Sequence, residues 1–425
     1  MGLRRFTARE WESSALARSR SGLGGSEQQR EAVREICRRV AEEGDAALFE
    51  YSRRFDGWAP SAQEPLVLER PRFAAALAEL PAEDRLAMEL AAARIRAFHE
   101  AQVYGDVSGP EGLRLLTRPV RRAGLYVPGG RAAYPSTVLM TAIPARVAGV
   151  REVLVATPPA RDGDVARAVL AAAAVAGVDQ VYRMGGAQAI AALSYGTASV
   201  PRVDVLAGPG NLYVTLAKRE VFGVVGVDGA AGPTEILVVA DRSAPAQLVA
   251  ADLASQLEHD PLAWAVLVTD SPGLADAVEE AFTDLLGQLD RADTVAAAHC
   301  CLVLADSLEE AMAVANRFAP EHLEILAEDA GRLLDQVESA GAVFLGPHTP
   351  VSLGDYVIGP NHTLPTAGAA RFGSPLGVYT FLKRTSVAEV GQGEYRELQE
   401  AASRLARLEG LTAHAYALEA RLGDG

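Results

Sequence analysis

Short apolar runs alternate with helical stretches along most of this 425-residue chain, and this alternation limits the possible folds more than any other feature. From Gly124 onward the apolar runs recur at intervals of about 25 to 40 residues. Repeated strand-helix units are typical of parallel sheets with helices on both faces. The predicted strands are 152–156, 180–184, 203–207, 235–240, 263–269, 301–305 and 342–345. We therefore expect an α/β fold, and the length favours two sheets over one.

Composition excludes several classes of function. The formal charge of -15, with 55 acidic and 40 basic residues and no basic stripe, disfavours nucleic acid as a partner. The longest apolar run, 168–178, has eleven residues, whereas a membrane span needs about 20, so we expect a buried helix and no membrane partner. Three cysteines, Cys37, Cys300 and Cys301, form no disulfide framework and no Cys-x-x-Cys pair. Together with an N-terminus that lacks an export-type apolar segment, this favours a cytoplasmic location. The only lysines are Lys218 and Lys383, so nearly all basic charge is arginine.

The two ends of the chain carry their own signals. The stretch 26–29, Ser-Glu-Gln-Gln, is a capping box that predicts a helix through about residue 41, after a glycine-rich hinge at 22–25. The segment 346–375 is rich in Gly, Pro, Thr and Asn with little periodicity, and loops of this length are usually functional. After Gly391 we expect a helical tail broken near Gly410.

Two glycine turns, Gly185-Gly186 and 208–211 (Gly-Pro-Gly-Asn), each lie where a strand ends and a helix begins. Amide N–H groups at a helix N-terminus favour phosphate oxygens, so a nucleotide could lie across both turns. The dinucleotide fingerprint is incomplete, because Tyr213 stands where its third glycine belongs. Taken alone, glycine turns in an α/β sheet are more often just tight connections, which is the structural alternative.

A helix after Ser243 carries an apolar stripe of Val249, Leu253 and Leu257. Gln256 falls within this stripe and His259 at its edge, close enough to share one metal ion. A hydrogen-bonded core amide and histidine is the structural alternative.

Further along, Glu321-His322 sets a carboxylate beside an imidazole, which suits acid-base chemistry. Asp355 and His362 stand in the aperiodic segment and are common zinc ligands. Polar side chains also flank the break in the helical tail, ending at His414. A surface Glu-His pair and a frayed helix end are the structural alternatives for the first and last of these.

The motifs together resemble the histidinol dehydrogenase family over the whole chain. Those that carry the resemblance are 126–130 (YVPGG), 135–140 (PSTVLM), 185–193, 208–211 (GPGN), 320–323 (PEHL), 354–356 (GDY) and 359–366 (GPNHTLPT). The resemblance implies a cytoplasmic homodimeric enzyme that oxidises L-histidinol, through bound L-histidinaldehyde, to L-histidine with NAD⁺ and one Zn²⁺ per subunit. It places the reaction at the end of histidine biosynthesis.

By this resemblance, zinc is held by Gln256, His259, Asp355 and the partner's His414, and the substrate's own nitrogens complete six ligands. His322 is the general base, and Glu321 activates the water that attacks the bound aldehyde. The implied substrate contacts are Thr234, Gln256, His259, His322, Asp355, His362, Glu409 and His414, the last and Glu409 reaching in from the partner subunit. Tyr126, Gln188 and Asn211 match the family's NAD contacts.

We expect the fold class to be two Rossmann-like parallel-sheet domains with a short N-terminal arm and a C-terminal helical extension. The arm is 1–22; residues 23–123 and 233–373 form the domain with the zinc and catalytic residues; 124–232 form the NAD domain; and 374–425 reach the partner.

One position departs from the family pattern and leaves alternatives open. The chain has Thr234 in 232–235 (Gly-Pro-Thr-Glu), where the family commonly has Ser. Threonine keeps the hydroxyl of serine but adds a methyl group. A relative acting on another small alcohol, such as a sulfonated diol, is the nearest alternative. A cysteine-dependent aldehyde dehydrogenase using Cys300 or Cys301, and a non-catalytic NAD-binding protein, are the others.

Overall fold

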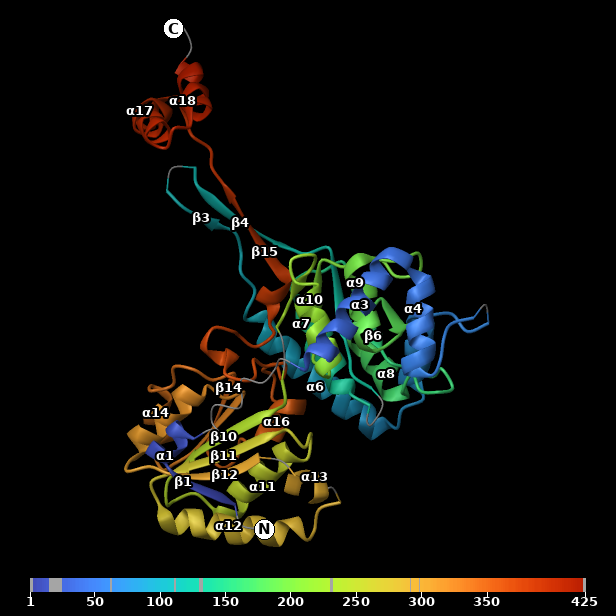
Figure 1. Ribbon diagram of the computed structural model, residues 1–425, viewed down its shortest axis with the longest axis vertical. Coiled ribbons are helices and arrows are strands. Elements are labelled where there is room, and N and C mark those ends of the chain that lie inside the picture. Colours follow the sequence, from blue (N-terminus) through green and yellow to red (C-terminus); the bar gives the residue numbers. More distant parts are fainter. Residues whose placement is uncertain are drawn as a thin grey trace. The chain divides into compact units, whose positions relative to one another are not determined.

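The chain divides into two units in the computed structural model (Figure 1). The first comprises Met1–Val103 and Val120–Phe381, and the second Tyr104–Pro119 and Leu382–Gly425. The structure describes residues 3–14, 25–61, 63–110, 112–129, 133–229, 232–290, 292–297 and 299–422. The predicted hinge at 22–25 and most of the second half of the predicted arm lie outside these residues, apart from Gly25.

One sheet of the first unit has the strand order β2-β7-β6-β5-β8-β9, parallel except for β2. Its strands are β2 (Val67–Glu69), β5 (Arg122–Tyr126), β6 (Glu152–Thr157), β7 (Gln180–Arg183), β8 (Val205–Ala207) and β9 (Gly226–Val227). The helical elements around it are α3 (Glu27–Glu43), α4 (Asp45–Tyr51), the π-helical η1 (Ser52–Asp56), α5 (Arg70–Ala78), α6 (Ala82–Glu100), α7 (Pro135–Val147), α8 (Arg167–Ala176), α9 (Gly186–Tyr195) and α10 (Leu212–Glu220).

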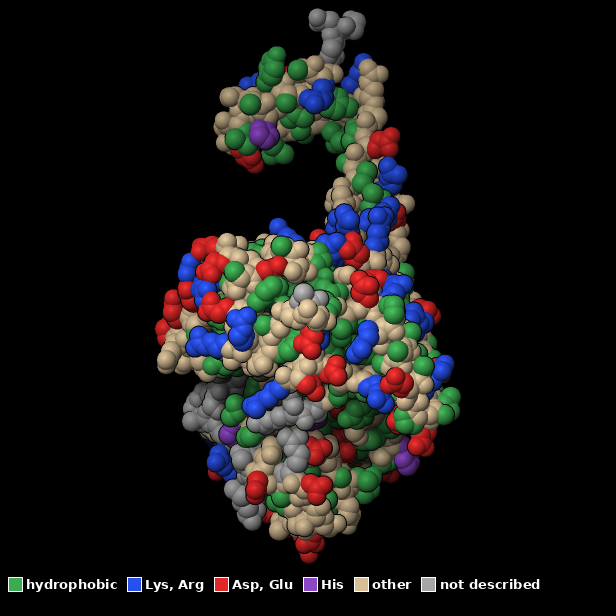
Figure 2. All heavy atoms as spheres, turned by 90° about the vertical axis from the view of Figure 1, so that its right-hand side faces the viewer, with side chains coloured by type: hydrophobic (Ala, Val, Ile, Leu, Met, Phe, Trp, Pro, Cys, Tyr) green, Lys and Arg blue, Asp and Glu red, His purple; other side chains and the backbone are tan. Residues whose placement is uncertain are grey.

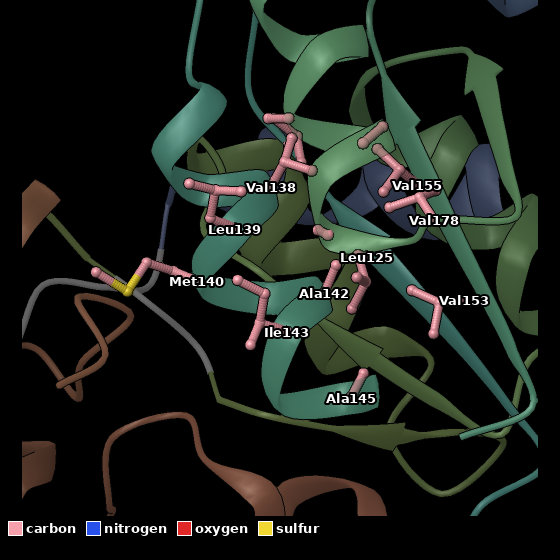
Figure 3. Packing of buried hydrophobic residues seen from close by; sticks show 14 of the residues in the cluster. Leu125, Val138, Leu139, Met140, Ala142, Ile143, Ala145, Val153, Val155 and Val178 are labelled. Carbon is pink, nitrogen blue, oxygen red and sulfur yellow. The ribbon is translucent and has the colours of Figure 1, made fainter. Parts of the chain in front are cut away.

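Alternating side chains of these strands feed two cores, as the period of two requires. Leu125 and Val153 face α5 to α8, whereas Tyr126 and Leu154 face α3, α4, α9 and α10. Figure 3 shows the first of these cores, in which residues of α7 pack beside residues of β5 and β6, namely Val138, Ala142, Ile143, Leu125, Val153 and Val155.

The other sheet of the first unit is wholly parallel, in the order β1-β12-β11-β10-β13-β14. Its strands are β1 (Arg4–Thr7), β10 (Glu235–Ala240), β11 (Trp264–Thr269), β12 (His299–Leu304), β13 (His322–Leu326) and β14 (Ala342–Leu345). One face is covered by α11 (Ala246–Leu257), α12 (Pro272–Leu286), α13 (Ala292–Ala297) and α16 (Val351–Tyr356). The other face is covered by α1 (Ala8–Ser13), α14 (Leu308–Phe318) and α15 (Ala330–Leu334). Two short 3₁₀ helices follow, η2 (Ala369–Arg371) and η3 (Val378–Phe381).

The second unit is a three-stranded antiparallel sheet and a helical hairpin. Its elements are β3 (Val107–Ser108), β4 (Arg114–Pro119), β15 (Leu382–Val387), α17 (Gln392–Leu408), α18 (Thr412–Glu419) and η4 (Ala420–Leu422). The predicted break at Gly410 is confirmed, because it separates α17 from α18 with φ at +75°. None of the helices described is both long and apolar enough to cross a membrane.

The predicted α/β class with two parallel sheets is confirmed, and so are the predicted strands to within a few residues. Ser26 caps α3 with the expected reciprocal bonds to Gln29. The segment 346–375, which the sequence predicts to be a loop, contains the short helices α16 and η2.

The predicted grouping of chain segments differs from the packing. We expected 23–123 to join 233–373, but β2 pairs with β7, and α3 to α6 cover the sheet of 122–227. The predicted arm instead contributes β1 to the edge of the other sheet, where it pairs with β12. At the other end, 374–381 stays with the first unit, since Phe381 is fully buried in its core, and 104–119 joins the second unit through β4 and β15.

Candidate active site

Two predicted site segments meet at the amino ends of neighbouring parallel strands. Thr234 immediately precedes β10, and Glu321 precedes β13, with Ile236 of β10 paired to His322 of β13. Ligands in open α/β sheets usually lie at the carboxyl ends of the strands. This cluster therefore occupies the opposite edge, where α11 ends with Gln256 in its last turn.

A chain of hydrogen bonds joins three of the predicted residues. The Gln256 side-chain amide donates to the Thr234 hydroxyl, which donates to Oε2 of Glu321 over 2.6 Å. The backbone N–H of Glu235 donates to the same carboxylate oxygen over 2.9 Å. Gln256 is therefore a buried, hydrogen-bonded amide, as the structural alternative expected. Its partner, however, is the Thr234 hydroxyl, which in turn binds the Glu321 carboxylate.

Burial makes the Glu321 carboxyl suitable for proton transfer near neutral pH. The residue is 7% exposed, and burial raises the pKa of its carboxyl to about 7, against the opposing effects of His322, Thr234 and the Glu235 N–H. A carboxyl that titrates near the operating pH is an effective general acid or base. The surface alternative for the Glu321-His322 pair is therefore wrong, because both residues are buried.

A backbone contact orients the His322 ring. Its Nδ1 lies 2.9 Å from the carbonyl oxygen of Glu235, and the ring is 3% exposed. Because a carbonyl only accepts, Nδ1 carries the hydrogen, and this assignment leaves Nε2 with a lone pair. Nε2 can therefore take a proton from a substrate hydroxyl. Glu235 was not singled out in the sequence, because its contribution is a backbone carbonyl that no residue type signals.

The aperiodic segment contributes to the same cluster. His362 Nδ1 lies 2.9 Å from the carbonyl oxygen of Asp355, and burial lowers the pKa of His362 while the Asp355 carboxylate opposes the shift. His322 and His259 also act on His362 electrostatically, so all four side chains lie within one neighbourhood. His259 is solvent-exposed, two residues beyond the end of α11.

The predicted zinc ligands are divided between the two units, with Gln256, His259 and Asp355 in the first and His414 in the second. Within the described ranges, no three His, Cys, Asp or Glu side chains form a metal-binding group. Glu409 and His414 belong to the second unit, where Glu409 ends α17, His414 lies in α18, and both are exposed. The first unit therefore brings together Thr234, Gln256, His259, Glu321, His322, Asp355 and His362.

The three predicted NAD residues lie around the carboxyl ends of β5, β7 and β8, and two are buried. The Tyr126 hydroxyl accepts from the Gly186 N–H over 3.0 Å, and burial raises its pKa to about 12. The Gln188 amide donates to Asp56 over 3.3 Å. Asn211 is exposed and caps α10 through its side-chain oxygen.

The first glycine turn does not offer its first amides to a phosphate, which corrects the prediction for that turn. Gly185 N–H donates to Asp56, and Gly186 N–H donates to Tyr126, so both groups already have intramolecular acceptors. Asp56, missed in the sequence, is delivered there by the π-helical turn η1, and burial raises its carboxyl pKa. Single π-helical turns are frequent at functional sites.

The cysteine alternative does not fit the structure. Cys301 is fully buried in β12, and burial raises its thiol pKa to about 12, while the pKa of the Cys300 thiol is also raised by burial. A nucleophilic cysteine requires the opposite shift.

A second acid pair is formed by Asp252 of α11, one turn before Gln256, and Glu324 of β13, two residues after His322. Glu324 is buried and Asp252 is half-buried. Their side chains interact directly, and Glu324 Oε2 has no hydrogen-bond partner among the described residues. Burial, reinforced by Asp252, raises the pKa of Glu324 from 4.5 to about 9. At pH 7 the folded protein therefore holds a proton that the unfolded chain releases.

We expect Glu324→Gln to stabilise the protein at alkaline pH. Because the raised pKa makes the folded state bind more protons, the free energy of unfolding falls as pH rises between about 4.5 and 9, and the neutral amide removes that slope. Denaturant titrations should give the variant an advantage on the order of 1–3 kcal/mol at pH 8 and little at pH 5. The exposed Glu280→Gln serves as control; parallel pH profiles for Glu324→Gln and wild type would contradict the assignment.

Comparisons with known proteins agree with the motif pattern. The family model described as histidinol dehydrogenase matches residues 20–422. The chain is 52% identical to "Histidinol dehydrogenase" of Synechococcus sp. over 92% of this chain and 91% of that protein. It is 48% identical to that of Aromatoleum aromaticum over 99% and 98%. The crystal structure of histidinol dehydrogenase from Elizabethkingia anophelis superposes with a TM-score of 0.91 at 32% identity, over 99% and 98% of the two chains.

A likeness of fold alone extends further. An acetylating aldehyde dehydrogenase from Geobacillus thermoglucosidasius gives a TM-score of 0.51 at 12% identity, over 90% of this chain and 98% of that one.

Proposed function

Because the chain belongs to the histidinol dehydrogenase family, it is an NAD-linked oxidoreductase of histidine biosynthesis, and we propose that the clustered side chains perform the full four-electron oxidation of L-histidinol to L-histidine. The observation that carries the proposal is the buried Glu321-His322 pair, whose ring is oriented by the Glu235 carbonyl. The relatives at about 50% identity support this reaction and not the sulfonated-diol alternative.

In the first oxidation, His322 accepts the hydroxyl proton at Nε2. Hydride leaves an alkoxide far more readily than an alcohol, so the base must lie within about 3 Å of the hydroxyl. NAD, when bound, supplies the hydride acceptor. The fixed Nδ1–H bond to Glu235 keeps the basic nitrogen aimed away from the backbone.

In the second oxidation, Glu321 activates the water that attacks the aldehyde. Its carboxyl titrates near pH 7, so it can accept the proton of water at physiological pH. The Thr234 hydroxyl and the Glu235 N–H hold Oε2 in place. Both donors also keep the carboxylate oriented when its charge changes.

The donor set fits a zinc ion, which we propose is held by Gln256, His259 and Asp355 with His414 from a second subunit. Because the Gln256 side-chain N–H donates to the Thr234 hydroxyl, the side-chain carbonyl oxygen is the atom available as a ligand. Amide and carboxylate oxygens with imidazole nitrogens suit an expanded zinc shell. Bound zinc would orient the amine and imidazole of the substrate, which Glu409 of the second subunit and His362 would also contact.

For NAD we propose contacts with Tyr126, Gln188 and Asn211. A cavity of about 720 Å³ lies past the carboxyl ends of β5 and β6 of the same sheet, lined by Pro128, Gly129, the residues that follow β6, and side chains of α5 and α8. The three proposed contacts are not among its lining residues. The carboxyl edge of a parallel sheet is the usual location for such a ligand.

A homodimer with shared sites is part of the same proposal. The helical hairpin carries exposed apolar side chains that a second copy would cover, and Figure 2 shows hydrophobic side chains at its surface. These include Leu398, Leu405, Leu408 (82% exposed), Leu411 and Tyr416. Exposed apolar patches usually mark interaction sites.

We also propose a cytoplasmic location.

Product stoichiometry tests the reaction. We expect two NADH for each L-histidinol consumed, together with L-histidine identified by chromatography. One NADH per substrate with accumulated aldehyde would contradict the four-electron scheme. A sulfonated diol offered as the sole substrate should give no turnover.

Metal removal tests the zinc proposal. Dialysis against a chelator should reduce histidinol-dependent NADH formation to background, because substrate would lose its orienting ion, and added Zn²⁺ should restore it. A parallel dialysis against zinc-saturated chelator is the control. Full turnover by protein shown to be metal-free by elemental analysis would end the proposal.

A further inference from the structure

Lys218 is one of two lysines in a chain that otherwise uses arginine, yet it is only 3% exposed. It lies on α10, and its ammonium is 2.6 Å from Asp228 Oδ1, with both side chains buried. An ammonium is a compact charge with three donors, whereas a guanidinium is a wide planar fork. The buried site therefore requires the smaller cation.

The pair holds the backbone of one residue, Gly208, through the two peptide units on either side of its Cα. The Lys218 ammonium donates to the Gly208 carbonyl oxygen, and the Gly208 N–H donates to Asp228 Oδ2 over 2.7 Å. Opposite charges thus bind the two polar groups of one residue. Charge-assisted bonds of this kind are about twice as strong as neutral ones.

Gly208 lies in a tightly packed position between two strands. Its φ is +111°, and a Cβ there would lie 2.2 Å from the Tyr126 carbonyl oxygen. Strands β5 and β8 are neighbours, with Leu125 opposite Ala207, and the chain connections diverge to either side of them. Ligands bind in the crevice at such a switch point.

We propose that Lys218 and Asp228 are positioning residues for NAD, an inference that rests on the proposed function. They fix the backbone of Gly208, which lies against Tyr126, and through it the turn 208–211 that ends at Asn211. Because Lys218 lies on the helix that this turn begins, its bond to the Gly208 carbonyl oxygen ties the turn to α10. The pair itself contacts no reacting atom.

The test uses the full-length enzyme with zinc. The double variant Lys218→Met/Asp228→Leu removes both charges together and so leaves neither one buried without its partner. We expect the KM for NAD, and the Kd for NAD by titration calorimetry, to rise roughly tenfold. The KM for histidinol, the zinc content and kcat at saturating NAD should stay within about twofold.

Asp204 provides a matched control. It binds the N–H groups of Arg121 and Arg122 over 2.9 Å at the amino end of β5, the opposite edge of the same sheet. Asp204→Asn should lower the melting temperature without changing the KM for NAD. Lys218→Arg, which keeps the charge but not its size, should raise the KM for NAD as the double variant does.

An unchanged Kd for NAD in a folded double variant would overturn the inference. An equal loss of affinity for NAD in Asp204→Asn would also overturn it, because the effect would then be general loosening of the sheet. The calorimetric titration needs no turnover. A wild type that binds NAD without oxidising histidinol would therefore refute the proposed reaction and leave the role of the pair to be decided by the Kd values.

Discussion

Replacing His322 by asparagine is expected to lower kcat for histidinol oxidation by about 10²–10⁴-fold, the range usual for loss of a general base. Asparagine can still donate to the Glu235 carbonyl that holds the ring in the wild type, so the local fold and the zinc content should be retained. It has no atom that accepts the hydroxyl proton. Steady-state turnover at saturating NAD, with circular dichroism of the variant, measures the effect.

The exposed His348 allows a matched control, because His348→Asn makes the same chemical change outside the cluster. It should leave kcat unchanged. A His322→Asn enzyme with turnover within threefold of wild type would show that the proton leaves by another route.

Glu321→Gln should separate the two oxidations. Glutamine retains an oxygen that can accept from Thr234 and the Glu235 N–H, but it takes no proton from water. We expect aldehyde oxidation to fall by about 10²–10⁴-fold and alcohol oxidation by far less. In a single turnover, one NADH should form rapidly and the second slowly, with bound aldehyde trapped by a hydrazine reagent.

The pH profile adds an independent readout. Because the carboxylate must be ionised to accept the proton, the rate of aldehyde oxidation in the wild type should rise with pH through about 7 and then level off. The glutamine variant should lose that rise. Glu328→Gln, at an exposed position, is the control, and equal losses in both oxidations of Glu321→Gln would contradict the assigned role.

Local patterns predicted much of the fold. The capping box of α3 and the strands of both sheets depend on neighbouring residues, so they could be read from short windows. The placement of 27–103 against the sheet that contains β5 to β9 could not be predicted in this way, because β2 pairs with β7 across more than a hundred residues. No local signal specifies which of two similar sheets a helix covers.

The active cluster was predicted in part for the same reason. The stripe on α11 correctly placed Gln256 toward the interior, and the side chains at 321 and 322 suggested acid-base chemistry. Sequence patterns did not indicate three further groups, because each acts through a backbone group or a distant partner. These are the Glu235 carbonyl, Asp56, and the Lys218-Asp228 pair that binds Gly208. Of these residues, Lys218 had a signal in the composition, because it is one of two lysines in a chain rich in arginine.

The choice of the amino edge for the catalytic cluster has an electrostatic consequence. In a parallel α/β layer the connecting helices run opposite to the strands, so this edge collects helix C-termini, which carry partial negative charge. α11 ends there at Leu257, and α14 ends three residues before Glu321. The field at this edge favours cations such as a metal ion or the ammonium group of an amino alcohol, while the carboxyl edge of the companion sheet, lined by helix N-termini, favours anions. The proposed zinc ion and the proposed NAD contacts thus lie at sheet edges of opposite polarity.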